Sequence, residues 1–262
     1  MKFCDFSDDL SSLGKLKRLE TLSFYACGMV SLPNELGELE SLKILDLTAC
    51  HTLKRIPPNV IRRLSQLEAL TIDWFFKNWE VEGTTNNLNL SELNSLPHLR
   101  MLFIQLNLES LPQGYVFPDW QNFFISINMS SSVYFQPFDS EDNLFCSESK
   151  DLKIKNLDAS SMKAFKNLFR TVERIWIESC ETEYIVETIR GNHTVIFANV
   201  VELHLENMSY LRRICDGPNQ YEIFSNLTIL FANECTRLTS LFSPPLARSL
   251  KKLKELLSFP MP

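Results

Sequence analysis

The sequence has no long apolar run. No stretch of about 18 apolar residues occurs in its 262 residues, so it predicts no membrane-spanning helix. The first ten residues, MKFCDFSDDL, carry acids where a secretory signal would carry its apolar stretch. With 45% hydrophobic and 22% charged residues, the composition is that of a globular protein. We therefore expect neither secretion nor membrane spanning.

The sequence also lacks zinc-binding cysteine pairs and an excess of positive charge. Its seven cysteines form no C-x-x-C pair, so we expect free, reduced thiols in the cytosol. The histidines show no metal-ligand spacing with one another or with the acids; they are His51, His98, His193 and His204. A net charge of −6 and a pI of about 5.4 oppose binding to nucleic-acid phosphates. The sequence predicts no metal, no cofactor and no nucleic-acid partner.

A phosphate-binding loop is missing as well. Such a loop needs G-x-x-x-x-G-K-[ST], and Gly14-Lys15 is the one Gly-Lys pair. Asp9 stands where the first glycine belongs, and Leu16 stands where the magnesium-binding hydroxyl belongs. No other motif of the sequence indicates catalysis, apart from the adjacent Cys50 and His51 considered below. We expect no enzymatic activity.

What the sequence does contain is a repeat. Cys4, Cys27 and Cys50 lie 23 residues apart, and L-x-x-L-x-L-x-x-C with a delayed Leu/Ile-Pro recurs around them. This is the pattern of a leucine-rich repeat. Later copies keep the apolar frame at 67–72, 99–104, 172–180, 200–214, 227–241 and, incompletely, from 250; weaker candidates lie at 120–125 and 152–154.

The repeat dictates the architecture. Alternation over x-L-x-L predicts a short strand whose leucines point inward. One copy buries about five apolar side chains at roughly 1.5–3 kcal/mol each, against an ordering cost of roughly 1.5 kcal/mol per residue. A single copy cannot fold alone, so copies must stack. The sequence predicts an α/β repeat solenoid: a leucine-rich-repeat horseshoe with a parallel concave sheet and an irregular or short helical convex side.

We expect one leucine-rich-repeat domain over residues 1–262, incomplete at both ends. Its parts are regular repeats at 1–112, irregular repeats or an insertion at 113–166, and degenerate repeats at 167–262. The segment 73–92 lengthens one copy and holds an aromatic cluster of Trp74, Phe75, Phe76 and Trp79. It is interpreted either as a binding loop or as a tolerated surface insertion.

The repeated cysteine follows the strand, where the chain turns and leaves backbone polar groups facing the core. A small side chain that tolerates burial and offers an S–H donor suits this place. It is occupied by Cys27, Cys50, Cys180 and Cys235, with Met208 as a departure. His51 has no counterpart in the other copies. We therefore expect a structural thiol beside an exposed histidine, and not a catalytic pair.

Strand residues that alternate with the inward leucines should point to the concave face in rows. Aromatic side chains among them are typical interface anchors, and we weight ligand contact and internal docking equally for them. The candidate protein-binding residues of this face are Tyr25, Asp46, Thr71, Asp73, Trp74, Phe103, Trp176, Glu178, His204, Glu206 and Phe231. His204, beside Glu202 and Glu206, is interpreted as a solvated ion pair. The basic run between Lys150 and Arg174 is interpreted as a solvated face.

Longer stretches carry a family resemblance. LGKLKRLETLSFYACGMVSLPNELGELESLKILDLTACHTLKRIPPNVIRRLSQLEAL resembles the repeat domain of plant intracellular nucleotide-binding leucine-rich-repeat disease-resistance proteins of the coiled-coil class. FPDWQNFFISI, RTVERIWIESC and VVELHLENMSYLRRIC resemble later segments of that domain, in order. Plant receptor ectodomains usually show L-x-G-x-I-P, and MVSLPNELGEL in its place favours the intracellular branch.

The resemblance implies a protein-recognition and autoinhibitory module of a plant immune receptor that detects pathogen effectors. The implied partners are an effector or a guarded host protein, and the nucleotide-binding module of a full-length relative. The implied location is the cytoplasm, with the nucleus or the membrane periphery as alternatives. A stand-alone adaptor or scaffold that binds a host protein is the alternative function. A phosphate-binding loop encoded upstream of Met1 would favour the receptor, and its absence would favour the adaptor.

Overall fold

The computed structural model describes residues 10–72, 75–80, 86–107, 109, 111–112, 114–129, 150–158, 161–187, 196–216 and 223–258. The chain divides into two compact units. Unit 1 comprises Met1–Tyr115 and Trp120–Glu148, and unit 2 comprises Val116–Asp119 and Ser149–Pro262. Each unit is a stack of leucine-rich repeats, as the sequence predicts. The interpretation of 1–262 as one domain stays a prediction.

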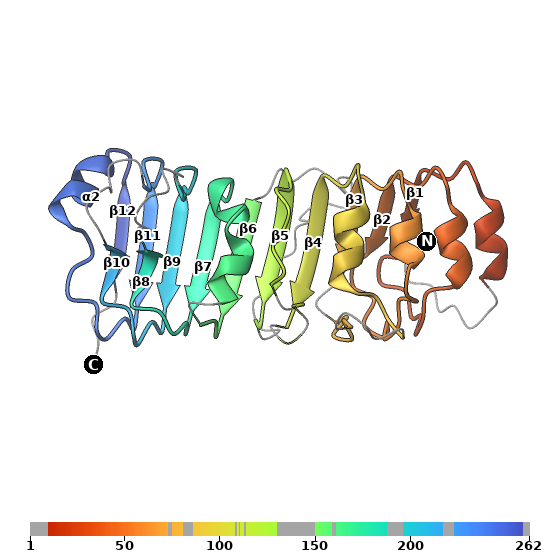
Figure 1. Ribbon diagram of the computed structural model, residues 1–262, viewed down its shortest axis with the longest axis horizontal. Coiled ribbons are helices and arrows are strands. Elements are labelled where there is room, and N and C mark those ends of the chain that lie inside the picture. Colours follow the sequence, from red (N-terminus) through yellow and green to blue (C-terminus); the bar gives the residue numbers. More distant parts are fainter. Residues whose placement is uncertain are drawn as a thin grey trace. The chain divides into compact units, whose positions relative to one another are not determined.

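Unit 1 is built on a parallel sheet in which neighbours in sequence are neighbours in space (Figure 1). Its strands are β1 (Thr21–Ser23), β2 (Ile44–Leu47), β3 (Ala69–Ile72), β4 (Met101–Leu106) and β5 (Asn122–Ile127). The register aligns equivalent positions of the repeat, because Leu22 pairs with Leu45, Leu45 with Leu70, and Leu70 with Leu102. The weak copy at 120–125 is confirmed, since Phe123 pairs with Leu102.

Unit 2 has a parallel sheet of the same kind and a second, smaller one (Figure 1). The strands of the larger sheet are β6 (Lys150–Lys155), β7 (Arg174–Glu178), β9 (Glu202–Glu206), β11 (Ile229–Asn233) and β12 (Glu255–Ser258). Between them, β8 (Tyr184–Glu187) pairs in parallel with β10 (Arg213–Asp216). The weak copy at 152–154 is confirmed as β6, in which Leu152 pairs with Ile175.

The inward positions of the strands form the core. In unit 1 the row from Leu22 to Phe123 is buried, and in unit 2 the row from Leu152 to Leu230 is fully buried. Burial of each such side chain contributes about 1.5–3 kcal/mol. Since a strand buries only two or three of them, the stack and not the single repeat is the stable unit.

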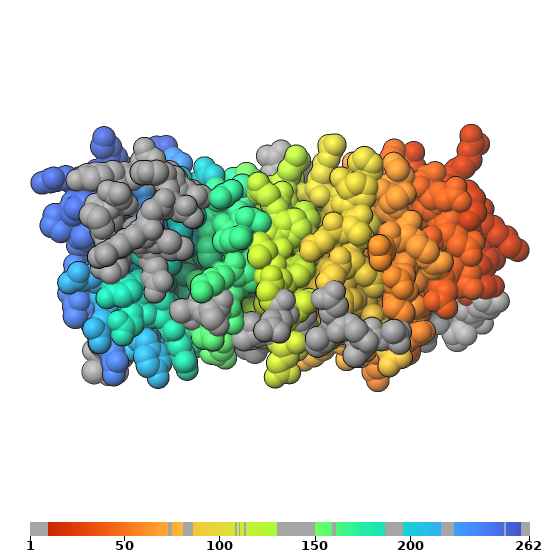
Figure 2. Space-filling model, in the orientation of Figure 1, coloured from red at the N-terminus to blue at the C-terminus, as the bar shows by residue number. Residues whose placement is uncertain are grey.

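Short helical turns cover the other side of the repeats. They are η1 (Ser11–Lys15), η2 (Asn34–Glu38), α1 (Val60–Arg63), η3 (Leu90–Ser95), η5 (Ser161–Phe165), η6 (Leu168–Arg170) and α2 (Pro244–Ser249). In unit 1, η1, η2, α1 and η3 contact one another in that order, and Figure 2 shows their side chains abutting along this face. Asn89 and Glu92 form a capping box at η3, which explains why that turn begins there.

Phenylalanines form the core beneath these turns in unit 2. Phe165, Phe169, Phe197 and Phe224 follow one another with ring centroids 4.7–6.2 Å apart. Phe197 and Phe224 each begin a Phe-x-Asn step with a left-handed backbone, at φ of 60° and 59°. The asparagine that follows donates to a carbonyl of the preceding repeat. In each Phe-x-Asn step the phenylalanine fills the core, and the asparagine links neighbouring repeats by a hydrogen bond.

The turn after the strand confirms the role expected for the cysteines. Residues just before them adopt left-handed backbone angles, with φ of 58° at Ala49 and 52° at Ser179. The Cys50 thiol is buried and donates to the carbonyl of Phe24 in the preceding repeat at 3.2 Å. The thiol of Cys180 donates to the carbonyl of Glu178 at 3.4 Å. Cys4 lies outside the described residues.

The described part of the segment 73–92 contributes to the core. Phe76 and Trp79 are buried against each other with centroids 5.5 Å apart, and the Trp79 Nε1 donates to the Gln105 carbonyl at 3.0 Å. Asn87 is also buried, and its side chain accepts from the Ile56 amide while donating to the Lys54 carbonyl. These residues are more than a tolerated surface insertion, and a binding role for the segment stays a prediction.

Candidate functional site

The open face of each sheet, defined as the side turned away from the inward leucines, carries the candidate row. In unit 2 the pairing of β6, β7, β9 and β11 places Lys153, Trp176, His204 and Phe231 side by side. The Trp176 and His204 rings stack at 4.9 Å, and His204 lies 5.6 Å from Phe231. The Lys153 Nζ lies 4.6 Å from the Trp176 centroid. We call these four side chains the aromatic row.

Three of the four side chains of the aromatic row are partly accessible to solvent. Trp176, His204 and Phe231 are half-buried, whereas Lys153 is buried. Three flat side chains held side by side on a rigid sheet lose little conformational entropy when they contact a partner. The row therefore has the composition and rigidity of a protein-binding anchor.

The surroundings of His204 disfavour the charged form of its imidazole. Burial lowers the pKa of its imidazole, and the nearby carboxylate of Glu202 only partly offsets this effect. The His204 Nε2 lies 3.6 Å from the Glu202 Oε2 and has no hydrogen-bond partner among the described residues. The predicted contact between His204 and Glu202 is present, but burial disfavours the charged imidazole that an ion pair needs. Stacking between two aromatic rings removes the water that a charged imidazole needs.

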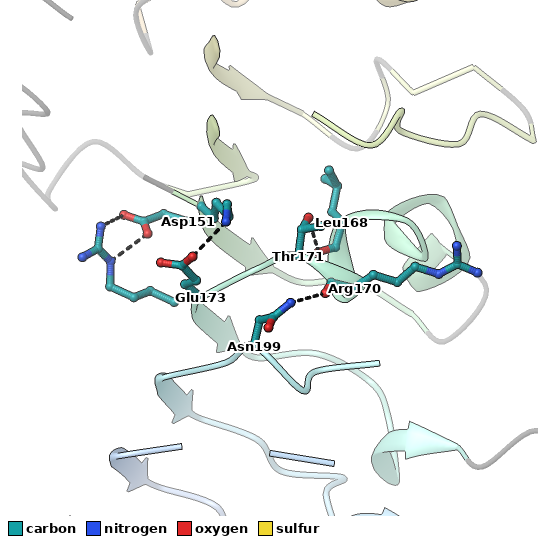
Figure 3. Close-up of polar contacts among 8 residues, drawn as sticks. Asp151, Leu168, Arg170, Thr171, Glu173 and Asn199 are labelled. Carbon is teal, nitrogen blue, oxygen red and sulfur yellow. Dashed lines mark hydrogen bonds and ion pairs between the residues drawn. The ribbon is translucent and has the colours of Figure 1, made fainter. Parts of the chain in front are cut away.

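Ion pairs between β6 and the β7 region flank the aromatic row. Arg174 donates from Nε and Nη2 to the two carboxylate oxygens of Asp151, at 2.7 and 2.9 Å. Lys150 donates to Glu173 at 2.9 Å, and Lys155 pairs with Glu178. Figure 3 shows the contacts of Asp151, which lies on β6, and of Glu173, which directly precedes β7.

Several basic side chains of the run between Lys150 and Arg174 thus form ion pairs within unit 2. Each of the three pairs joins residues 23 positions apart, because one repeat separates them. Asp151 is fully buried, so its pair with Arg174 is not a solvated surface contact. The interpretation of this run as a solvated face is wrong for the buried Lys153, whereas Lys150 and Arg174 are partly exposed.

The loop from η6 into β7 is fixed by two further contacts that Figure 3 shows. The Thr171 hydroxyl donates to the Leu168 carbonyl at 3.4 Å, and the Asn199 side chain donates to the Arg170 carbonyl at 2.7 Å. Because Asn199 belongs to the next repeat, this contact helps set how β9 follows β7. The position of Trp176 relative to His204 rests on such contacts.

In unit 1 the corresponding row is Ser23, Asp46, Thr71, Phe103 and Phe124, again in strand register. Here two of the candidate side chains are covered by their neighbours. Asp46 is 0% exposed and Phe103 is 3% exposed. Asp46 accepts from the Ser23 hydroxyl at 2.6 Å and from the Thr48 amide at 2.9 Å, and Phe103 stacks on Phe124 at 6.4 Å. These side chains lie on the open face, but their neighbours cover them.

The other predicted residues are divided between exposed, covered and undescribed positions. Glu206 is exposed, and Tyr25 and Glu178 are half-buried. Thr71 is buried, and its hydroxyl has no hydrogen-bond partner in the part of the chain that the structure describes. Asp73 and Trp74 lie outside the described residues. Sequence reasoning missed Lys153 and Phe124, although both stand in the x position of the copies at 152–154 and 120–125.

The Cys50 and His51 pair has no catalytic geometry. The Cys50 thiol faces the Phe24 carbonyl inside the stack, whereas the exposed His51 ring packs edge-on against Phe75 with centroids 3.9 Å apart. Across the described residues, no group of three or more metal-binding side chains comes together. Of the helices that the structure describes, none has the length and apolarity that a bilayer crossing requires.

Comparisons with known proteins give the family of the repeats. A family model described as "Plant disease resistance protein RPS2-like, leucine-rich repeats" matches residues 125–258, slightly more than half of the chain. Disease resistance protein At4g27190 of Arabidopsis thaliana is 34% identical over 100 residues, which are 37% of this chain and 10% of that relative. The match therefore spans about a tenth of the relative's length.

Two solved structures are similar at low scores. An internalin (inlF) of Listeria monocytogenes aligns over 94% of this chain and 69% of its own, with 16% identity and a TM-score of 0.36. The repeat ectodomain of the receptor kinase GASSHO1/SCHENGEN3 of Arabidopsis thaliana aligns over 97% and 40%, with 14% identity and a TM-score of 0.28. The fold assignment rests on the repeat register and the family match. The matched family is one of repeats and not of enzymes, and the chain belongs to the RPS2-like leucine-rich repeats of plant disease resistance proteins.

Proposed function

We propose that the chain is the recognition and autoinhibitory repeat module of a plant immune receptor. In this proposal its open face binds a pathogen effector or a guarded host protein, and in the resting receptor it docks on the nucleotide-binding module. The receptor acts in the cytoplasm. The observation that carries the proposal is the accessible aromatic row of unit 2, held on a rigid sheet in a chain of the disease-resistance repeat family.

The mechanism is a docking equilibrium with two states. In the resting state the repeat module contacts the nucleotide-binding module through the aromatic row. This contact keeps the nucleotide-binding module inactive. An effector that contacts the same side chains competes with that docking, and the equilibrium shifts by the difference between its affinities for the two states. Rigid side chains suit such competition, because little conformational entropy is lost when either partner binds them.

The first experiment is to sequence the full transcript that encodes this chain. A G-x-x-x-x-G-K-[ST] loop in the same reading frame, upstream of Met1, is expected for a receptor. Its absence from the whole transcript would overturn the receptor function and leave the adaptor that binds a host protein.

The second experiment uses the full-length protein in leaf cells. Trp176→Ala combined with Phe231→Ala should cause cell death without a pathogen if the row holds the resting state. The same variant should abolish pathogen-triggered death if the row contacts the effector. Val30→Ala removes an exposed apolar side chain of unit 1 and serves as the matched control. A variant that folds, by circular dichroism, and behaves as the wild type in both assays would contradict the proposal.

A further inference from the structure

A hollow of about 740 Å³ lies in unit 2 beside the small sheet of β8 and β10. It is lined by Tyr184, Arg212, Arg213, Thr236, Arg237, Leu238 and Thr239. None of these residues belongs to the aromatic row. Tyr184 and Arg213 are register partners in the small sheet, and Arg213 forms a parallel bridge with Ser240 of the next repeat. Three successive repeats therefore build the walls.

The lining is strongly basic in a protein that is acidic as a whole. It contains three arginines and no carboxylate, although the net charge of the chain is −6. Arg212 lies 3.7 Å from Glu183, and both side chains are half exposed, so water weakens that pair and a ligand can replace it. Arg213 and Arg237 make no ion pair with any other residue that the structure describes.

Neighbouring groups fix the walls without using up the guanidinium donors. The Thr239 amide and hydroxyl both donate to the Arg212 carbonyl at 3.2 Å, which ties the backbones of two repeats together. The Arg237 guanidinium lies 5.8 Å from the centroid of Tyr210, whose side chain is half exposed. Stacking of this kind orients the planar fork of an arginine and leaves its N–H groups available.

We propose that this hollow binds a phosphoryl group carried on a peptide of a protein partner. A phosphate monoester carries nearly two negative charges and three acceptor oxygens, and guanidinium forks match its geometry with paired hydrogen bonds. Arg213 and Arg237 contact the phosphoryl oxygens. Arg212 exchanges Glu183 for the same group, and Tyr210 is a positioning residue for Arg237.

The repeat family of the chain favours a peptide over other phosphate carriers, because leucine-rich-repeat domains bind proteins. The hollow is open, since the side chains of Arg212, Arg213 and Arg237 are exposed, so a phosphorylated residue of a partner can reach their guanidinium groups. A nucleic acid needs a longer positive track, which the acidic chain opposes. This site is separate from the open face, so it extends the proposed function and does not depend on it.

The test measures binding of a degenerate peptide library in phosphorylated and dephosphorylated form to the whole 262-residue protein. Each library peptide has one phosphoserine, phosphothreonine or phosphotyrosine at a fixed position. Enrichment of phosphorylated over dephosphorylated peptides by about tenfold or more is expected, since one tenfold step is the least that paired charged hydrogen bonds contribute. Arg213→Gln and Arg237→Gln should each reduce this enrichment about tenfold.

Matched variants separate a site from general charge. Arg248→Gln removes an exposed arginine of unit 2 outside the hollow and should leave the enrichment unchanged. Tyr210→Ala should weaken binding, and Tyr210→Phe should restore it, because a phenyl ring still orients Arg237. Equal losses in Arg248→Gln and Arg213→Gln, with circular dichroism unchanged, would overturn the proposal.

Further probes identify the carrier of the phosphate. Inorganic phosphate should compete only at much higher concentration than the selected peptide. Vesicles of phosphatidylcholine with 5% phosphatidylinositol 4,5-bisphosphate should not compete at equal phosphate concentration. No enrichment of phosphorylated peptides, equal competition by inorganic phosphate, or tighter binding to the vesicles would each refute a peptide site.

Discussion

The buried ion pair between Asp151 and Arg174 provides a quantitative test of how β6 and β7 are joined. The change is Asp151→Asn, which keeps the shape of the side chain and removes its charge. Asp151 is fully buried, and it accepts from two guanidinium nitrogens at 2.7 and 2.9 Å. The charge of Asp151 also acts on the buried Lys153. Burial lowers the pKa of the Lys153 ammonium, and the attraction to Asp151 only partly offsets this effect.

The expected loss is about 2 kcal/mol. Breaking a fully buried pair typically costs about 3–5 kcal/mol. The Arg174 side chain is 36% exposed, so water solvates part of its charge after the change, and the cost falls below that range. Asparagine still accepts one hydrogen bond, which lowers it further. The remaining destabilisation has two sources. Arg174 loses one of its two charged hydrogen bonds, and the charged Lys153 loses the attraction of the Asp151 carboxylate.

The assay is amide hydrogen exchange over 150–155 and 174–178. Local exchange suits a chain of two compact units, for which a single unfolding free energy is not well defined. A loss of about 2 kcal/mol predicts about thirtyfold faster exchange in these strands. Trp176, the one tryptophan of unit 2, gives an independent fluorescence signal for the same region in urea.

The matched control is Glu173→Gln, which makes the same charge change in the neighbouring pair with Lys150. Both side chains of that pair are partly exposed, so the expected loss is below about 0.5 kcal/mol. The two deficits should also respond differently to pH. Burial lowers the pKa of folded Lys153 below its unfolded value, so the folded state binds fewer protons and gains stability as the pH rises toward 10.

Without Asp151 this gain is larger, so the stability deficit of Asp151→Asn should narrow as the pH rises toward the unfolded pKa of lysine, about 10.4. Equal deficits in Asp151→Asn and Glu173→Gln would refute the reasoning that burial decides the strength of the pair. A deficit that does not change with pH would show that Lys153 does not take part.

Three further predictions concern single side chains. Burial lowers the pKa of His204, so wild-type stability should fall as the pH drops through about 6.5, and His204→Phe should abolish that fall; an unchanged fall would contradict it. Iodoacetamide should label the half-buried Cys235 well before the buried Cys50 in the native protein, and rapid labelling of Cys50 would revive a nucleophilic role. Phe76→Ala should cost about 3–5 kcal/mol by hydrogen exchange in β3 and β4, whereas the exposed Lys77→Ala should cost less than about 0.5 kcal/mol.

The strand positions could be predicted from the sequence because two independent signals coincide. Alternation fixes which residues point inward, and the repeat period fixes where the next strand begins. Even copies with a poor pattern follow this rule. Phe123 and Leu152 were weak candidates, and both pair in the expected register.

Burial on the open face could not be predicted in the same way. Alternation assigns a side chain to a face, but it does not say what the neighbouring repeat places beside it. Phe103 is covered although it points outward, since Phe124 of the next strand stacks on it. The charge of His204 depends likewise on Trp176 and Phe231, which come from two other repeats.

The small sheet and the basic hollow escaped the sequence reasoning for a different reason. β8 and β10 are four residues long, and Tyr184 or Arg213 at their first positions carries no apolar alternation. A strand this short is visible only through its partner one repeat away. The repeat period alone does not give the pairing: aligning Trp176 with His204 places Tyr184 beside Arg212, whereas the strands pair Tyr184 with Arg213, one residue further on.

The same repeat therefore places two different surfaces. In unit 2 a residue of the aromatic row is followed eight or nine positions later by a residue of the hollow: Trp176 by Tyr184, His204 by Arg213, and Phe231 by Thr239. The turn between them carries the buried Cys180 or Met208, or the half-buried Cys235, which packs between the two surfaces. An insertion of one residue after such a turn shifts the hollow residue of its repeat and leaves the strand register of the row unchanged. The two surfaces can thus change independently, although the turns hold both in place.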